Sequence, residues 1–445
     1  MSMDAFPVRL SSPFSTPGPR GRLRLPSLPR DDAATTIVNT LVFIGMLLLL
    51  GVSAMALDAL GLHYERPGGS LLGKIHPATY VILLALLVRL AASPAPWRHL
   101  NAIIARQNGT FWFCLTGGLL LAQIVLVQHL PFSPVIDTFL LPVVLSILLL
   151  DADPDHLRRL APLLHVMFAA NALLALFENI TGHRLTPYVA GSYVVTNDWR
   201  ATALFGHPLV NGMLTGTYII IMSFGGLGAM KPMLRPFAMA LQMAALVAFG
   251  ARAATTLLLP FLLIAAWGGG RSLLRGRRFP ASVWLATLLL ALLAAAAIGL
   301  VGYLGYFDRF AERFVNDNGS ASARLSLFHI MAAVPWSQLW LGPDQRIVTA
   351  LEVLDGSRYG LESLWISFFL TYGILVSLVF FAGLAAFCLD IIHHASKASW
   401  MVFIYFFLVA TTSVSLSAKT TEFALVVAMV LVFQRPRYQA STSLA

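Results

Sequence analysis

Long apolar runs separated by short polar segments dominate the hydrophobic pattern of this chain. A helix needs about 20 apolar residues to cross the hydrocarbon core of a bilayer. About twelve runs approach this length, so we expect about twelve transmembrane helices. The runs are 37–57, 77–92, 111–128, 135–150, 160–177, 209–229, 236–250, 253–267, 281–303, 364–389, 400–416 and 423–433.

The composition agrees with this pattern. Of 445 residues, 58% are hydrophobic and 11% are charged, and the mean hydropathy is +0.77. A soluble globular domain of this size has no means of burying so much apolar surface. The sequence therefore predicts an all-α, polytopic transmembrane helix bundle.

Lysine and arginine residues fall in alternate connecting segments, and topology rules place such segments in the cytoplasm. The residues assigned to that side are Arg9, Arg20, Arg22, Arg24, Arg30, Arg98, Arg106, Arg158, Arg159, Lys231, Arg235, Arg271, Arg275, Arg277, Arg278, Lys397, Arg435 and Arg437. The alternation predicts an even number of helices with both termini in the cytoplasm. The formal net charge of +10 follows mostly from this bias, so it does not indicate a nucleic-acid partner.

The two ends of the chain are predicted to be cytoplasmic tails around one membrane domain. Residues 1–35 are rich in Pro, Ser and Arg and lack the apolar core of a signal peptide, which predicts a disordered tail. Residues 36–435 form the membrane domain, and 436–445 form the second tail. Cys114 and Cys388 fall inside predicted helices, so we expect neither a disulfide nor a thiolate metal site.

Most polar residues on the outer side belong to two predicted loops. One covers 178–208, and the longer one covers 305–361, between the ninth and tenth predicted helices. Within the longer loop, 323–331 has helical periodicity and predicts an amphipathic segment along the membrane surface. Trp336, Trp340 and Tyr359 fit an aromatic belt at the membrane interface.

Three arginines lie at or beside an outer membrane boundary: Arg200, Arg252 and Arg324. Arg252 stands between two apolar runs, on the side where topology rules predict few positive charges. Guanidinium groups bind phosphate oxygens through a planar pair of donors, so a convergent set would suit a lipid-linked pyrophosphate. The alternative for each arginine is a contact with a lipid phosphate or with helix carbonyl groups.

The segment from Arg200 to Pro208 with Asn211, followed by Arg252 at a helix junction, resembles the O-antigen polymerase and ligase family of Wzy and WaaL type. Arg324, the turn at 341–343 and the segment 362–374 resemble the end of the same pattern. The likeness covers about 199–374 and is greatest to the VpsF-type exopolysaccharide polymerases.

The resemblance implies a GT-C-like fold and glycosyl transfer at the periplasmic face of the bacterial inner membrane. The donor would be the growing chain on undecaprenyl pyrophosphate, and the acceptor would be a hydroxyl of the next lipid-linked repeat unit. No metal or other cofactor is expected. The expected partners are this lipid-linked oligosaccharide, membrane lipids, a chain-length regulator and a flippase.

The expected catalytic residues are Glu362, Arg252 and Arg324. Ligases of the family carry a His–Asn pair where this chain has Glu362–Ser363, which favours a polymerase. Glu362 is the first candidate for the general base, and the two arginines would stabilise the leaving pyrophosphate. The alternative for Glu362 is an ion pair with a loop arginine.

The expected substrate-binding residues are Arg200, His207, Asn211, Asp344 and Lys419. His207 is also the second candidate for the general base, although a contact at the helix N-terminus explains it equally well. Asn211 would orient a sugar or a backbone group. Lys419 would either join the phosphate site or meet lipid head groups.

Three other functions fit parts of the pattern. A ligase would use the same donor. A transporter or flippase would share the helix number and the basic outer loop, but the two halves of this chain lack the internal similarity that many carriers show. A membrane acyltransferase would need a His–Asp pair that has no clear counterpart here.

Overall fold

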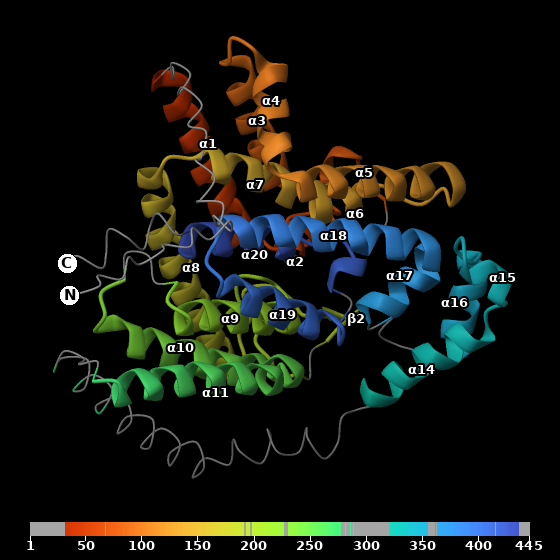
Figure 1. Cartoon of the computed structure of the whole chain (residues 1–445). Coiled ribbons are helices and arrows are strands. Elements are labelled where there is room, and N and C mark those ends of the chain that lie inside the picture. Colours follow the sequence, from red (N-terminus) through yellow and green to blue (C-terminus); the bar gives the residue numbers. More distant parts are fainter. Residues whose placement is uncertain are drawn as a thin grey trace, which may run out of the picture.

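A computed structural model of the whole chain describes residues 32–66, 68–190, 193–195, 198–226, 230–276, 281, 285, 288, 320–354, 361, 363–413 and 415–435. Helices make up nearly all regular structure in these ranges (Figure 1). The strands described there are one antiparallel pair of two residues each, β1 (Val189–Ala190) and β2 (Tyr193–Val194). The predicted all-α class is confirmed.

Six helical stretches in the described part are long and apolar enough to cross a membrane. They are Ala33–Gly51 in α1 (Asp32–Gly51), Asn108–Val127 in α5 (Asn108–Ala122) and η2 (Gln123–Val127), Ser133–Asp151 across α6 (Ser133–Val135), η3 (Ile136–Leu140) and α7 (Leu141–Asp151), α8 (Pro154–Thr181), α11 (Arg252–Leu274) and α18 (Ile374–His394). Their number indicates a multi-pass membrane protein.

Other predicted helices are bent or short. The helices α3 (Pro77–Ala91) and α4 (Pro96–Arg106) meet at a bend of 117°, and they make a further span if they cross together. Shorter apolar helices are α9 (Pro208–Ser223), α10 (Leu234–Phe249), α19 (Ser399–Ala410) and α20 (Glu422–Phe433). Most of the predicted helix 281–303 lies outside the described residues.

Hydropathy misplaced several helix ends. Helix α1 begins at Asp32, inside the predicted tail 1–35, and ends at Gly51. The rest of the first apolar run forms a separate short helix, α2 (Ala54–Ala59), because Ser53 adopts an extended conformation and its Oγ accepts a hydrogen bond from Ala56 N at 3.2 Å. Helix α8 continues to Thr181, so the loop predicted at 178–208 covers 182–207.

The apolar run 364–389 forms two helices rather than one. Helix α17 (Leu364–Tyr372) ends before Gly373, which has φ of 87°, and α18 follows directly. Gly373 packs on Gly342, and a Cβ at Gly373 would lie 2.3 Å from Gly342 N. The motif segments 341–343 and 372–374 are therefore in direct contact.

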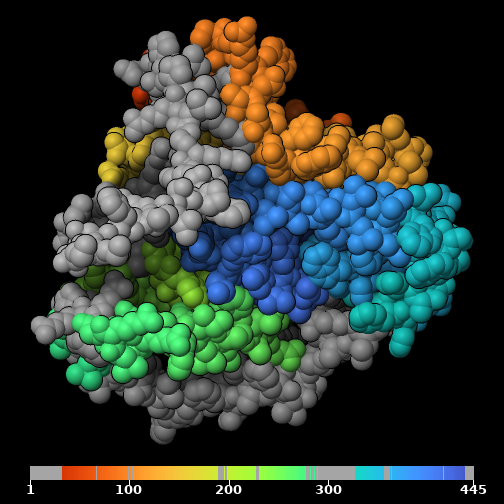
Figure 2. Space-filling view, viewed as in Figure 1, coloured from red at the N-terminus to blue at the C-terminus, as the bar shows by residue number. Residues whose placement is uncertain are grey.

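The helix bundle has a buried centre. In α20 every residue from Phe423 to Phe433 is at most 2% exposed. Around it, α5 and α18 pack closely because Gly109 faces Ala386 and Gly383 faces Thr116. Small residues at such contacts let the backbones approach, which is how helices associate in membranes. Figure 2 shows these C-terminal helices between the N-terminal helices and α11.

Three short helices form a lobe at one side of the bundle (Figure 1). They are α14 (Ser320–Ala333), α15 (Trp336–Leu339) and α16 (Gln345–Leu354), and with α17 they enclose a second apolar cluster of Leu327, Ile330, Val334, Leu339, Val348, Ile366 and Leu370. Helix α14 buries Leu327 and exposes Phe328, so it does not separate apolar from polar side chains as the predicted amphipathic segment would. Trp336 and Trp340 are exposed, and Tyr359 lies outside the described residues.

The two ends of the bundle carry different polar groups. At one end Arg89 pairs with Asp151 at 2.6 Å, and Arg435 donates to Leu149 O at 2.9 Å. Helix α8 begins at this end, and its 28 residues span about 42 Å. The loop 182–207 therefore lies at the opposite end of the bundle.

We expect Gly373→Ala to lower the stability of the protein by more than about 1 kcal/mol, because alanine disfavours positive φ and its Cβ would meet Gly342 N. Thermal melting of the purified protein in detergent measures the effect. Gly117→Ala is the matched control, because a Cβ at Gly117 meets no atom within 4 Å. Equal melting temperatures for the two variants would contradict the role of this contact.

Candidate functional site

A buried carboxylate organises the loop that follows α8. Glu178 is 2% exposed, and its two oxygens accept hydrogen bonds from the backbone N–H groups of Leu185 at 2.8 Å, Thr202 at 2.8 Å and Ala203 at 2.9 Å. One side chain thus joins the beginning of the loop to its end. The sequence analysis treated Glu178 only as a loop boundary, although an acidic residue in the last turns of an apolar helix is itself a signal.

Two buried asparagines hold the end of the same loop. Asn171 Oδ1 accepts a hydrogen bond from Leu204 N at 2.9 Å. Asn211 Nδ2 donates to Thr202 O at 2.6 Å and to His207 O at 3.0 Å. Asn211 is completely buried, and contact with the backbone was one of its two expected roles.

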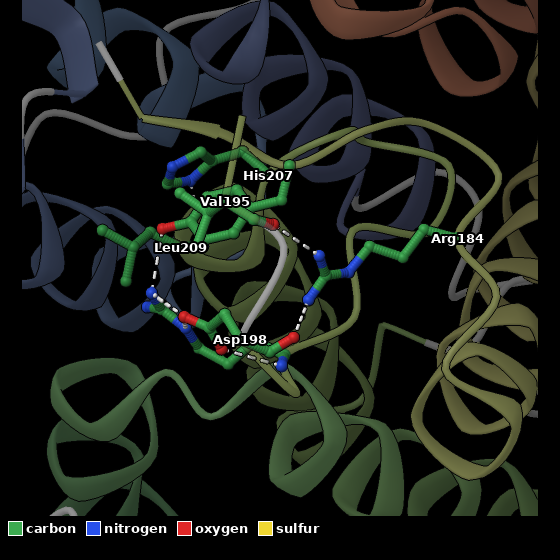
Figure 3. Close-up of polar contacts among 7 residues, drawn as sticks. Arg184, Val195, Asp198, His207 and Leu209 are labelled. Atoms are coloured by element: carbon green, nitrogen blue, oxygen red, sulfur yellow. Dashed lines mark hydrogen bonds and ion pairs between the residues drawn. The ribbon is translucent and has the colours of Figure 1, made fainter. Parts of the chain in front are cut away.

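A cluster of charged and aromatic side chains lies on this scaffold (Figure 3). Arg200 Nε and Nη2 donate to Asp198 Oδ2 at 2.9 and 2.7 Å, and Nη2 also donates to the Tyr188 hydroxyl at 2.8 Å. Arg184 Nη1 donates to Val195 O at 3.0 Å, and Nη2 donates to Asp198 O. The Arg200 and Arg184 guanidinium carbons lie 5.1 and 5.7 Å from the centroid of the Tyr188 ring. We call the side chains of Arg184, Tyr188, Asp198, Arg200 and His207 the Tyr188 cluster.

The Tyr188 cluster contains charges of both signs, so it is more than the single arginine that the sequence predicted. Two guanidinium groups and one carboxylate, that of Asp198, leave it a net charge of +1. The Arg200 and Asp198 side chains are only 15% and 9% exposed. The sequence analysis missed Arg184, Tyr188 and Asp198, although the neighbouring acid and base at 198 and 200 were visible.

His207 caps α9, and its Nδ1 accepts a hydrogen bond from Leu209 N at 3.2 Å. Burial and the positive charge of Arg200 lower the pKa of His207 to about 4, so the ring is neutral near pH 7. Because Nδ1 is occupied as an acceptor, we assign the proton to Nε2. This arrangement matches the expected contact at the helix N-terminus.

Arg252 stands at the junction between α10 and α11, where the sequence placed it. Helix α10 ends at Phe249, Gly250 adopts φ of 58°, and α11 begins at Arg252. The Arg252 side chain is half-buried. The helix boundary therefore depends on a glycine in the left-handed region.

The Tyr188 cluster lies directly against this junction. A Cβ at Gly250 would come within 3.0 Å of both Arg200 Cγ and the Trp199 ring. Ala201 N also donates to Ala248 O at 3.1 Å. The structure thus brings the Arg200 segment and the Arg252 junction together.

Lys419 belongs to a second polar cluster. Its Nζ donates to the carbonyl oxygens of Tyr64 and, at 3.1 Å, Lys74, and it lies 3.6 Å from the centroid of the Tyr64 ring. Burial lowers the pKa of Lys419, while the negative charges of Asp137 and Glu65 oppose this shift.

Asp137 is the centre of this second cluster. It is fully buried and accepts hydrogen bonds from the Tyr64 hydroxyl at 2.7 Å, His76 N at 3.0 Å and Thr79 Oγ1 at 2.6 Å. Glu65 lies nearby, and burial raises its pKa to about 6. Asp137 therefore holds the connection between α1 and α3 against the helix pair η3–α7.

The two clusters lie at the same end of the bundle. Gly206, with φ of 75°, packs on Ser53, and a Cβ there would lie 2.5 Å from Ser53 Oγ. The neighbouring Val52 O contacts His76 Nε2 at 2.9 Å. Gly206 precedes His207 in the first cluster, and His76 belongs to the second, so this contact connects them.

Three further expected site residues are Glu362, Arg324 and Asp344. Glu362 lies outside the described residues, and so does the side chain of Arg324, whose backbone is part of α14. Asp344 is exposed and accepts a hydrogen bond from Arg346 N at 2.9 Å at the start of α16. This hydrogen bond places Asp344 at the start of α16 in the lateral lobe.

Comparison of the chain with protein-family models, with curated proteins and with solved structures found no match. Among the described residues, no three His, Cys, Asp or Glu side chains are grouped so as to hold a metal ion. The site is therefore characterised by its own chemistry: guanidinium groups, a neutral histidine and buried carboxylates at one end of a membrane bundle.

We expect Glu178→Gln to lower stability by about 2–3 kcal/mol, because an amide nitrogen cannot accept the backbone N–H groups that the carboxylate oxygens accept. Thermal melting and limited proteolysis within 182–207 measure the change. Asp155→Asn is the control, because Asp155 forms an exposed ion pair with Arg158. Unchanged melting and cleavage in Glu178→Gln would show that the carboxylate does not hold the loop.

We expect His207 to make the protein less stable in acid. Its folded pKa of about 4 lies below the ordinary value of 6.5, so the unfolded chain takes up this proton first as the pH falls. The stability present above pH 6.5 should decrease by up to about 3 kcal/mol by pH 4. Melting temperatures across this range, compared with those of His207→Asn, isolate the effect, since asparagine also caps helices. Parallel curves for both proteins would refute it.

Proposed function

We propose that this chain is a polysaccharide polymerase of the bacterial inner membrane. It would join undecaprenyl-pyrophosphate-linked repeat units of an exopolysaccharide or O-antigen type at the periplasmic face. The observation that supports this proposal most is the contact of Arg200 with Gly250, two residues before Arg252, where α11 begins. Two separate parts of the resembled pattern meet there.

The positive charge of the arginines supplies the chemical reason for this proposal. A pyrophosphate leaving group gains negative charge as the glycosidic bond breaks, and fixed guanidinium groups stabilise charge that develops where they point. In this proposal Arg252 and Arg324 act on the leaving group, and Arg200 with Arg184 positions the pyrophosphate. His207 would donate from Nε2 to a phosphate or sugar oxygen.

The acceptor half of the reaction is assigned to Glu362, as the base that deprotonates the attacking hydroxyl. Its neighbour Ser363 is the N-cap residue of α17, the helix that ends at the contact of Gly373 with Gly342. This contact joins two further parts of the resembled pattern, which supports placing the Glu362 segment in the same machinery.

The proposal includes a GT-C-like bundle of about twelve helices with both termini in the cytoplasm. It is supported by the separation of polar groups, with Arg89 and Arg435 at one end and the Tyr188 cluster at the other. A flippase would deliver the lipid-linked units, and a chain-length regulator would act on the product. A ligase and a transporter are the competing functions that the experiment below separates.

We expect Arg252→Ala to reduce surface polymer about 100-fold, the loss typical of removing one transition-state donor. The measurement is the size distribution of glycan from a deletion strain complemented with each variant, alongside immunoblots of protein abundance. Arg252→Lys should restore little, because lysine lacks the planar pair of donors. Arg158→Ala is the control, since this exposed residue lies at the opposite end of the bundle.

The form of the remaining glycan separates the candidate functions. Single repeat units without long polymer support a polymerase. Long polymer that accumulates on the lipid carrier supports a ligase, and repeat units trapped on the cytoplasmic side support a transporter. Normal polymer from Arg252→Ala at normal protein abundance would rule out the role of this arginine.

A further inference from the structure

Asn171 in α8, Thr215 in α9 and Gln242 in α10 are polar residues in the interior of the bundle. Each is at most 1% exposed. Asn171 Nδ2, Thr215 Oγ1 and Gln242 Oε1 have no hydrogen-bond partner among the described residues. Native proteins rarely leave buried polar atoms in this condition, so these three atoms need an explanation. None of the three residues takes part in the proposed glycosyl transfer.

Contacts between the helices bring the three residues to the same depth in the bundle. The rings of Phe168 and Tyr218 stack with centroids 4.4 Å apart, and Gln242 Nε2 donates to Phe168 O at 3.0 Å. Helix α8 leads to the loop, and Asn171 lies three residues after Phe168, about 4.5 Å nearer the loop. Helix α9 leads away from the loop, and Thr215 lies three residues before Tyr218, by the same distance nearer the loop.

Thr215 also points towards α10. In α9, Tyr218 faces α8, whereas Gly212 faces Ala251 at the junction of α10 and α11. Thr215 stands three residues from each, and successive helical residues are about 100° apart, so it points between these two directions. Helix α10 packs against both α8 and α9 and occupies that position.

The Thr215 hydroxyl differs from other hydroxyls of the same helix. Thr217 Oγ1 donates to Met213 O at 2.8 Å, and Ser223 Oγ donates to Ile219 O at 2.8 Å. Each of these acceptors is the carbonyl oxygen four residues earlier, the usual partner of a hydroxyl inside a helix. Thr215 does not make this bond, so its hydroxyl remains available to a ligand between the helices.

The hydrogen bonds that the two amides do make fix the polarity of their remaining atoms. Asn171 Oδ1 accepts from Leu204 N at 2.9 Å, so its remaining atom is the donor Nδ2. Gln242 Nε2 donates to the Phe168 carbonyl, so its remaining atom is the acceptor Oε1. The Thr215 hydroxyl can donate or accept. The three residues therefore offer one donor, one acceptor and one group that does either.

Water matches this set of atoms. Asn171 Nδ2 and Gln242 Oε1 are complementary, yet they do not bond to each other, so a bridging group is needed to satisfy both. A buried water typically makes about three hydrogen bonds to buried polar groups, as donor and as acceptor. An ion would need a charged partner inside the bundle, and these three side chains are neutral.

We propose that Asn171, Thr215 and Gln242 bind an internal water molecule. The water accepts a hydrogen bond from Asn171 Nδ2, donates one to Gln242 Oε1 and forms its third with the Thr215 hydroxyl. Because Asn171 also holds Leu204 N, the water connects α9 and α10 to the end of the loop 182–207. The site does not depend on the proposed polymerase activity, so either can fail without the other.

A cryo-EM structure of the full-length protein in lipid nanodiscs, at a resolution that shows ordered water, tests the site directly. We expect a water peak within about 3.2 Å of both Asn171 Nδ2 and Gln242 Oε1. A direct hydrogen bond between the two amides, or no peak in contact with either atom, would overturn the proposal. This measurement needs no variant, so it applies even if a substitution prevents folding.

A double-mutant cycle tests whether Thr215 and Gln242 share one partner. Thr215→Val should lower the melting temperature by about 2–4 °C in the wild type, and by less than half as much when Gln242→Leu has already removed one bond of the water. Thr217→Val is the matched control, because Thr217 is completely buried in the same helix but bonds to Met213 O. Its shift should be the same with and without Gln242→Leu. Equally additive shifts for Thr215→Val would refute the shared water.

Discussion

The loop 182–207 keeps its shape because the carboxylate of Glu178 accepts hydrogen bonds from backbone N–H groups at both ends of the loop. These groups are removed from water by the surrounding helices, so each needs an internal acceptor. An ionised oxygen accepts several donors at once and forms stronger hydrogen bonds than a neutral one. The positions of Arg200 and His207 both follow from this one carboxylate, since each lies within a few residues of the backbone that it holds.

A second buried carboxylate holds separate segments together in the same way. Asp137 is completely buried and holds the connection between α1 and α3 through Tyr64, His76 and Thr79. The contact between Gly206 and Ser53 brings the two held segments against each other. The two buried carboxylates thus hold segments that are in contact with each other at one end of the bundle.

Hydropathy predicted helices well where a continuous apolar run decides the structure. The runs around α5, α7, α11 and α20 were placed correctly, and Arg252 begins a helix at the expected junction. The breaks at Ser53 and Gly373 were missed because they depend on backbone conformation inside runs that remain apolar. Average hydropathy does not contain that information.

The site was harder to predict than the fold, because its contacts join residues that are distant in sequence. Lys419 meets the carbonyl oxygens of Tyr64 and Lys74, and no local pattern indicates such a partner. Arg200 was recognised, but its hydrogen bond to the Tyr188 hydroxyl joins residues that are 12 positions apart. Only the pair of Asp198 with Arg200 was local enough to be read from the sequence.

In the proposed polymerase, the presence of Asp198 beside a pyrophosphate needs a physical reason, because a carboxylate repels phosphate. Ionic pairing fixes the planar guanidinium of Arg200 in one orientation, which reduces the entropy lost when a ligand binds. The guanidinium groups of Arg184, Arg200 and Arg252 and the carboxylate of Asp198 together carry a net charge of +2. A pyrophosphate diester carries two negative charges. In the proposed reaction the positive charge of the site thus equals the negative charge of the bound donor. The site then stabilises the transition state more than the bound donor, because bond cleavage adds further negative charge.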